Sequence, residues 1–119
     1  NIFYMKRLAR SVAHAGRGII FALKNERNFQ IEMIATLSVM ALMAWLPLST
    51  TEIIFLILAI TAVLSIELVN TAIERVMDIL KPRVHPYARV VKDIMAGAVL
   101  VVSCGSLLIG IVIFSPYIF

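Results

Sequence analysis

The side chains best suited to chemistry lie between residues 67 and 78, where acids and an amide recur at helical spacing. At 3.6 residues per turn these side chains fall within about 60° of one line along a helix, so they share one face. We call this face the acidic stripe, and it comprises Glu67, Asn70, Thr71, Glu74 and Asp78. Carboxylates gathered in this way can bind a hard cation, transfer a proton or pair with cations on other helices.

The acidic stripe continues directly from an apolar run over residues 53–66 and therefore begins inside a predicted membrane span. Of the 119 residues, 61% are hydrophobic, against about 45–50% in a typical soluble protein. The mean hydropathy of the chain is +0.98. A carboxylate inside a bilayer costs roughly 2.5–3.5 kcal/mol on insertion scales, so repeated acids at this depth indicate a functional site.

We expect an all-α membrane protein with a single domain over residues 1–119, built from one surface helix and three membrane spans. Residues 3–25 carry apolar and basic side chains on opposite sides of a helix, which predicts an amphipathic helix in the membrane interface within residues 1–28. The expected spans are residues 29–46, 53–80 and 94–114, the second with a cytoplasmic extension.

Prolines and a capping pattern separate the predicted spans. Pro47 closes the first span, and Ser49 and Glu52 have the spacing of a capping box for the next helix. Two prolines within residues 81–86 end the second span.

Two features inside the predicted spans concern contacts between helices. Glu32 lies about one turn into the first span, where it either hydrogen-bonds to another helix or contacts lipid. Ser106 and Gly110 in the third span have the small-xxx-small spacing that permits close helix packing.

The distribution of basic residues predicts the orientation in the membrane. All 11 Lys and Arg residues lie in residues 6–27 or 75–92. By the positive-inside rule these two segments are cytoplasmic and the C-terminus is outside. The acidic stripe then leaves the membrane beside both basic segments. The net charge of +4 therefore fits anionic lipid headgroups or phosphate ligands better than nucleic acid.

The cytoplasmic part of the acidic stripe is suited to binding a divalent cation. Magnesium commonly takes one or two carboxylates together with oxygens of substrate phosphates. Glu74 and Asp78, one turn apart, together with Glu26 before the first span, could supply such a pair.

Other charged residues extend the chemistry in two directions. Glu67 is the deepest acid of the stripe, shielded from water, and suits proton transfer better than metal binding. Lys92 and Asp93 add a cation and a carboxylate where the third span begins, and a positive helix end there favours anions. These parts together suit phosphoryl transfer, which depends on positioning and on neutralising charge.

Several familiar sites are absent from the sequence. Gly16-Arg17-Gly18 is not followed by the Lys and Ser or Thr of a P-loop, and His14 and His85 belong to no HExxH motif. The residues alone leave open a proton or ion pathway and a small non-catalytic membrane subunit.

The stretch Glu67-Leu68-Val69-Asn70-Thr71-Ala72-Ile73-Glu74, with Asp78, His85 and Lys92-Asp93 after it, resembles the bacterial diacylglycerol kinase family of small membrane kinases. The resemblance covers nearly the whole chain, including Lys24-Asn25-Glu26 before the first span. It implies a homotrimeric helical bundle in the bacterial cytoplasmic membrane, with active sites shared between neighbouring subunits.

The resemblance also implies roles for single residues. It makes Glu67 the general base that acts on a lipid hydroxyl, and it gives Glu26 and Glu74 the task of holding Mg²⁺ with the phosphates of ATP. Active-site positions of the family are matched by Asn70, Lys92 and Asp93, of which the last two are nucleotide-binding. Further nucleotide contacts are expected at Arg7, Arg83 and His85.

Within the family, the sequence is more similar to the undecaprenol kinase branch. The pertinent segments are Asn25-Glu26-Arg27-Asn28, Asn70-Thr71-Ala72, His85-Pro86-Tyr87-Ala88 and Ile113-Phe114-Ser115-Pro116. The expected reaction is therefore transfer of the γ-phosphoryl group of ATP to undecaprenol. Diacylglycerol is the alternative lipid substrate.

Overall fold

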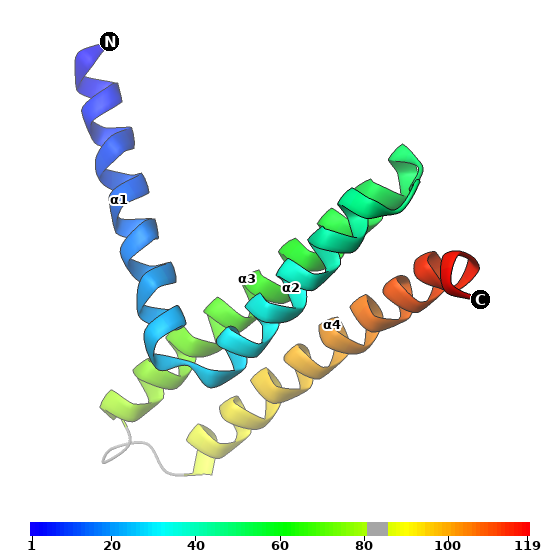
Figure 1. Ribbon diagram of the computed structural model, residues 1–119. Coiled ribbons are helices and arrows are strands. Elements are labelled where there is room, and N and C mark those ends of the chain that lie inside the picture. Colours follow the sequence, from blue (N-terminus) through cyan, green and yellow to red (C-terminus); the bar gives the residue numbers. More distant parts are fainter. Residues whose placement is uncertain (81–85) are drawn as a thin grey trace.

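The computed structural model describes residues 1–80 and 86–119, and these residues are almost entirely helical (Figure 1). The helices are α1 (Ile2–Asn25), α2 (Arg27–Trp45), α3 (Thr50–Leu80) and α4 (Pro86–Ile118). Three of them, α2, α3 and α4, are long and apolar enough to cross a membrane. The prediction of an all-helical chain with three helices suited to membrane spans is confirmed.

The junction between α1 and α2 is a single residue. Glu26 has extended backbone angles (φ −113°, ψ 110°), while its N–H still donates to the carbonyl of Ala22 at 2.9 Å. The Gln30 N–H in turn donates to the Glu26 carbonyl at 3.1 Å, which starts α2. The chain therefore changes direction at Glu26 while both backbone groups of Glu26 stay hydrogen-bonded, and α1 diverges from the other helices (Figure 1).

The predicted capping box at the start of α3 is present. The Ser49 N–H donates to Glu52 Oε1 at 2.9 Å, and the Glu52 N–H donates to Ser49 Oγ at 3.2 Å. The sequence did not reveal a third partner, because the Tyr117 hydroxyl at the end of α4 donates to the same Glu52 oxygen at 2.7 Å. The α2–α3 turn is thus tied to the C-terminal end of α4.

Helices α3 and α4 extend beyond the apolar runs from which their spans were predicted. α3 begins at Thr50, and α4 begins at Pro86, which is favourable in a first helical turn because its missing N–H would be unpaired there. At 31 and 33 residues, each exceeds the roughly 20 residues that a bilayer requires. Both helices therefore carry polar residues past one end of the span, beside each other.

Helix α3 is the central element, because it contacts each of the other three helices. A cluster of Leu56, Ile113 and Phe114 packs α3 against α4 near the α2–α3 turn, with Val39 and Leu42 of α2 beside it. Further along the same pair of helices, the Ser106 hydroxyl donates to the Ala59 carbonyl at 3.4 Å.

The small residues of α4 differ in what surrounds them. The Ser106 hydroxyl reaches the backbone of α3, whereas a Cβ atom added at Gly110 would meet no atom within 4 Å, so the close packing that their spacing permits is not formed at Gly110. Most apolar side chains on α2, α3 and α4 are likewise uncovered in the single chain, and Trp45 is 82% exposed. These surfaces are available to lipid or to other copies of the chain.

Candidate functional site

The acidic stripe faces the interior of the helix assembly at one end and water at the other. Glu67 is only 4% exposed and Thr71 only 8%, Glu74 is half-buried, and Asp78 is exposed. Val76, on the opposite side of α3, is 49% exposed. The polar face predicted from the spacing therefore points toward the interior. Its depth increases from the end of α3 toward Glu67.

Hydrogen bonds within α3 orient the polar residues of the stripe. The Thr71 hydroxyl donates to the backbone carbonyl of Glu67 at 3.0 Å, so this buried hydroxyl is satisfied without using the Glu67 carboxylate. The Asn70 amide donates to Glu74 Oε1 at 3.2 Å. Asn70 thus holds one oxygen of Glu74 in a fixed direction one turn further along the helix.

Glu26 is brought to the stripe from the α1–α2 junction by a contact with α3. Its Oε1 atom forms an ion pair and hydrogen bond with Arg75, the residue that follows Glu74. The guanidinium carbon of Arg75 also lies 5.3 Å from the centre of the Phe21 ring on α1, within the range of a cation–π contact. Three elements therefore meet at Arg75.

Asp78 lies between two cations at the exposed end of the stripe. One carboxylate oxygen is 3.9 Å from Arg75 and the other is 3.9 Å from Lys92 near the start of α4. These pairs are about half exposed, so each contributes little to stability. Their significance is positional, because they bring Lys92 and the neighbouring Asp93, which is exposed, to the open end of the stripe.

The side chains present fit a magnesium ion that is shared with a phosphate-bearing substrate. Within residues 1–80 and 86–119, no group of three or more His, Cys, Asp and Glu side chains forms a complete metal site. Magnesium does not require such a cage, because it uses one or two carboxylates, water and phosphate oxygens. Glu26 and Glu74 suit this mode, since each has one oxygen held by a neighbour, Arg75 or Asn70.

Of the remaining predicted nucleotide contacts, Arg7 lies apart from this cluster. Arg7 is exposed on the first half of α1, which projects away from the other helices (Figure 1). The single chain therefore does not bring Arg7 to the stripe. Arg83 and His85 lie outside the described residues.

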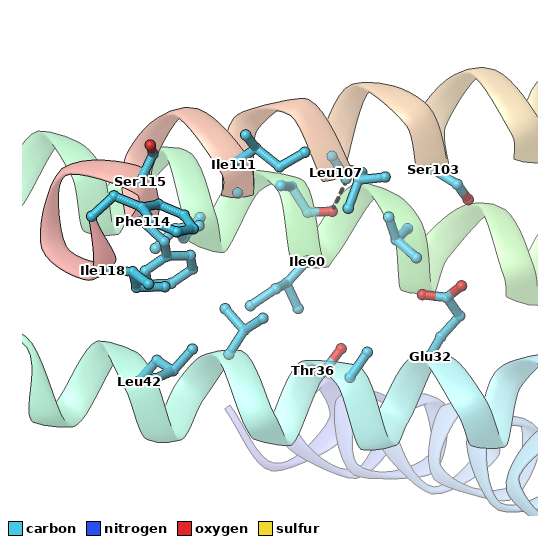
Figure 2. Close-up of a pocket in the computed structure, with 18 residues that line it drawn as sticks. Glu32, Thr36, Leu42, Ile60, Ser103, Leu107, Ile111, Phe114, Ser115 and Ile118 are labelled. Atoms are coloured by element: carbon cyan, nitrogen blue, oxygen red, sulfur yellow. Dashed lines mark hydrogen bonds between the residues drawn. The ribbon is translucent and has the colours of Figure 1, made fainter.

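A groove about 610 Å³ in volume runs along the membrane-spanning part, bordered by α2, α3 and α4. Figure 2 shows Glu32 projecting into it from α2 at one end, with Phe114 and Ile118 of α4 at the other. The lining is mainly apolar. Val63, one helical turn before Glu67, also borders the groove, so its polar end lies next to the deep end of the acidic stripe.

The buried acid and the cations lie at opposite ends of the stripe. Glu67 is 4% exposed, whereas Arg75 and Lys92 flank the exposed Asp78. Such an arrangement suits a site that takes up a proton at one end and binds an anion at the other.

One residue of this region, Arg75, was not identified from the sequence. Arg75 lies 100° around the helix from Glu74 and so falls outside the stripe, although it provides the link to Glu26. Glu32 was predicted either to hydrogen-bond to another helix or to contact lipid, and it borders the groove. The sequence shows only that Arg75 adjoins the stripe. That position becomes informative once α1 and the α1–α2 junction are known to lie beside it.

The sequence is similar to those of known lipid kinases. A family profile described as prokaryotic diacylglycerol kinase matches residues 13–114. The chain is 40% identical over 112 residues to an undecaprenol kinase of Bacillus subtilis (strain 168), covering 94% of this chain and 91% of that protein.

Two diacylglycerol kinases are also similar to the chain. The one from Synechocystis is 32% identical over 101 residues, covering 84% of this chain and 58% of that protein. The one from Escherichia coli (strain K12) is 28% identical over 95 residues, covering 80% and 78%. The chain therefore belongs to the prokaryotic diacylglycerol kinase family, a family of lipid kinases, and the predicted family resemblance is confirmed.

Proposed function

We propose that this member of the family transfers the γ-phosphoryl group of ATP to the terminal hydroxyl of undecaprenol, with Glu67 as the general base. The observation that carries the proposal is the gradient along the acidic stripe, from a carboxylate that is 4% exposed to the exposed cations beside Asp78. A lipid alcohol and a soluble nucleotide can approach one another from opposite ends of such a stripe. The identity of 40% to an undecaprenol kinase supports undecaprenol as the lipid.

In this proposal the exposed end of the stripe binds the nucleotide. Glu26 and Glu74 hold Mg²⁺, which when bound neutralises charge on the β- and γ-phosphates. Asn70 keeps Glu74 oriented, and Lys92 and Asp93 contact the nucleotide. Arg7, Arg83 and His85 complete the predicted set of contacts.

The buried end of the stripe binds the lipid. The groove beside Glu32 accommodates part of the isoprenoid chain, because its lining is apolar and it lies at membrane depth. As the lipid enters, its hydroxyl donates its one hydrogen bond first to Glu32, at the polar end of the groove, and then to Glu67 at the reacting position. Glu67 removes the hydroxyl proton as the hydroxyl oxygen attacks the γ-phosphorus. An O–P bond forms, the bond from the γ-phosphorus to the bridging oxygen breaks, and ADP leaves.

We infer that the N-terminus and the α3–α4 connection are cytoplasmic and that the C-terminus is outside. The support is that all 11 Lys and Arg residues lie in residues 6–27 or 75–92 and none lies in the α2–α3 turn. In that orientation α1 lies on the inner membrane surface, with its basic residues toward phosphate headgroups. The protein is then a single lipid-kinase domain over residues 1–119 of a bacterial cytoplasmic membrane.

We also propose that the active unit is a homotrimer with active sites shared between subunits. The uncovered apolar faces of α2, α3 and α4 allow such an assembly, and Arg7 requires either movement of α1 or a neighbouring subunit to reach a nucleotide. A neighbouring subunit supplies the simpler route.

Diacylglycerol is the second candidate substrate, favoured by the family profile and by the relatives from Synechocystis and Escherichia coli. Phosphorylation of diacylglycerol would use the same acids, and only the lipid in the groove would differ. The alternative of another class is a non-catalytic membrane subunit or proton pathway, in which the acids bind no nucleotide.

Nucleotide protection separates the kinase from the non-catalytic alternative. Purified protein in micelles is digested with a protease in the presence of ATP, with and without Mg²⁺, and the Glu74→Gln variant is treated in parallel. A kinase should be protected by ATP only with Mg²⁺, and Glu74→Gln should lose this protection. Equal digestion of the wild-type protein under all conditions would favour the non-catalytic alternative.

A further inference from the structure

Arg75 is the one side chain that joins the acidic stripe to both α1 and the α1–α2 junction in the described part of the chain. It forms an ion pair with Glu26, faces the ring of Phe21 at 5.3 Å, and lies 3.9 Å from Asp78 on its own helix. The side chain of Glu26 is only 18% exposed, whereas that of Arg75 is 46% exposed. The contact therefore holds the largely buried carboxylate of Glu26 through the half-exposed guanidinium group of Arg75.

We propose that Arg75 is a positioning residue that holds Glu26 for metal binding. This inference rests on the proposed function, because it assigns Glu26 the role of a Mg²⁺ ligand. Glu26 occupies the single residue between two helices, where the backbone is extended and no regular helical contact sets the direction of its side chain. An external partner is needed to set that direction, and Arg75 is the partner.

The contact pattern leaves the carboxylate able to bind a cation. The guanidinium group pairs with Oε1 of Glu26, and within the described residues Oε2 makes no hydrogen bond or ion pair. The Asn70 amide likewise donates to Oε1 of Glu74. Two carboxylates from different elements are thus each held through one oxygen, and their second oxygens take no part in these contacts. Partners that orient metal ligands in this way typically change metal affinity by about 10- to 100-fold when removed.

The ring of Phe21 explains why arginine is suited to the position. A guanidinium group is planar and can stack on a ring while its N–H groups bind a carboxylate, whereas the ammonium of lysine is a compact point charge. Phe21 lies on α1 four residues before the end of that helix, so the stack also fixes where α1 meets α3. Arg75 therefore sets both the direction of Glu26 and the base of the surface helix.

The test is the binding of Mn²⁺, used as a spectroscopic substitute for Mg²⁺, to detergent-solubilised protein with a non-hydrolysable ATP analogue. Free Mn²⁺ is measured by electron paramagnetic resonance, so neither lipid nor turnover is needed. We expect Arg75→Met to raise the dissociation constant for Mn²⁺ about tenfold, at the low end of the range because Arg75 is half exposed. Arg75→Lys should recover part of the loss, because it restores the charge without the stack.

Arg27→Met is the matched control. Arg27 is exposed, adjoins Glu26 in sequence and makes no ion pair with another described residue. Its loss removes the same charge from the same junction and should leave Mn²⁺ affinity unchanged. In turnover assays, Arg75→Met should raise the Mg²⁺ concentration for half-maximal rate by the same factor, while the rate at saturating Mg²⁺ and the KM for lipid stay within about twofold.

Each outcome decides the question. Equal Mn²⁺ affinity in wild-type and Arg75→Met protein would overturn the inference and leave the kinase proposal intact. The same conclusion would follow if Arg27→Met lost as much Mn²⁺ affinity as Arg75→Met. Absence of Mn²⁺-nucleotide binding in the wild-type protein would overturn the proposed function itself. If Arg75→Met does not fold, Phe21→Leu removes the stack alone and should raise the dissociation constant less; unchanged affinity in that variant would contradict the role of the ring.

Discussion

Replacement of Glu67 by Gln isolates the proposed proton transfer from every structural role of this residue. Gln keeps the shape and the helix propensity of Glu and removes its charge and basicity. The hydrogen bond from Thr71 survives, because it is accepted by the backbone carbonyl of residue 67 and not by the side chain. The variant should therefore fold with unchanged helix content.

The expected loss of turnover follows from how deeply Glu67 is buried. General-base catalysis typically contributes about 10²- to 10⁴-fold, and we expect the upper half of this range because a side chain that is 4% exposed cannot be replaced by bulk water. A loss of about 10³- to 10⁴-fold corresponds to about 4–5.5 kcal/mol in the barrier. Stability should not fall, because Gln keeps the shape of Glu and removes a carboxylate that is only 4% exposed.

The assay compares initial rates of lipid phosphorylation, circular dichroism and nucleotide binding for wild-type and Glu67→Gln protein. Glu52→Gln is the control, since it makes the same change at the opposite end of α3 while its Oε1 can still accept from Ser49 and Tyr117. Glu67→Gln should bind ATP and lose turnover, and Glu52→Gln should keep both. Turnover within about tenfold of wild type in Glu67→Gln would refute the general-base assignment.

Three further changes probe other parts of the molecule. Glu52→Ala removes the acceptor for both Ser49 and Tyr117 and should lower the midpoint of thermal unfolding followed by circular dichroism, with turnover retained at low temperature; an unchanged midpoint would contradict a stabilising role for these hydrogen bonds. Glu32→Gln should raise the KM for the lipid about tenfold in mixed micelles without changing that for MgATP, and an effect on MgATP alone would place Glu32 elsewhere. Phe29→Ala should cost about 3–5 kcal/mol because Phe29 is 2% exposed, and a loss below 1 kcal/mol would show that its packing is dispensable.

The features that the sequence predicted are those governed by local periodicity. The spacing of Glu67, Thr71 and Glu74 specifies one helix face, and that face had to turn inward because a lipid-facing stripe of acids is unfavourable. The capping box of Ser49 and Glu52 was predictable for the same reason, since both partners lie within one turn.

The features that the sequence did not predict are contacts between helices that lie far apart in the sequence. Arg75 and Glu26 are 49 residues apart, and Tyr117 and Glu52 are 65 residues apart. No periodic pattern links such positions, because their contact depends on the angle between α1 and α3 and on the length of α4. The direction of α1 in turn depends on a single extended residue, Glu26, whose backbone conformation has no strong signature in the sequence.

The most direct test of the central claim is phosphate transfer from labelled ATP by purified protein in mixed micelles, with undecaprenol and diacylglycerol offered separately, each with and without Mg²⁺. We predict rapid transfer to undecaprenol that requires Mg²⁺ and slower transfer to diacylglycerol. Preference for diacylglycerol would keep the mechanism and replace the substrate. Folded protein that phosphorylates neither lipid would contradict the assignment of the acidic stripe as a kinase site.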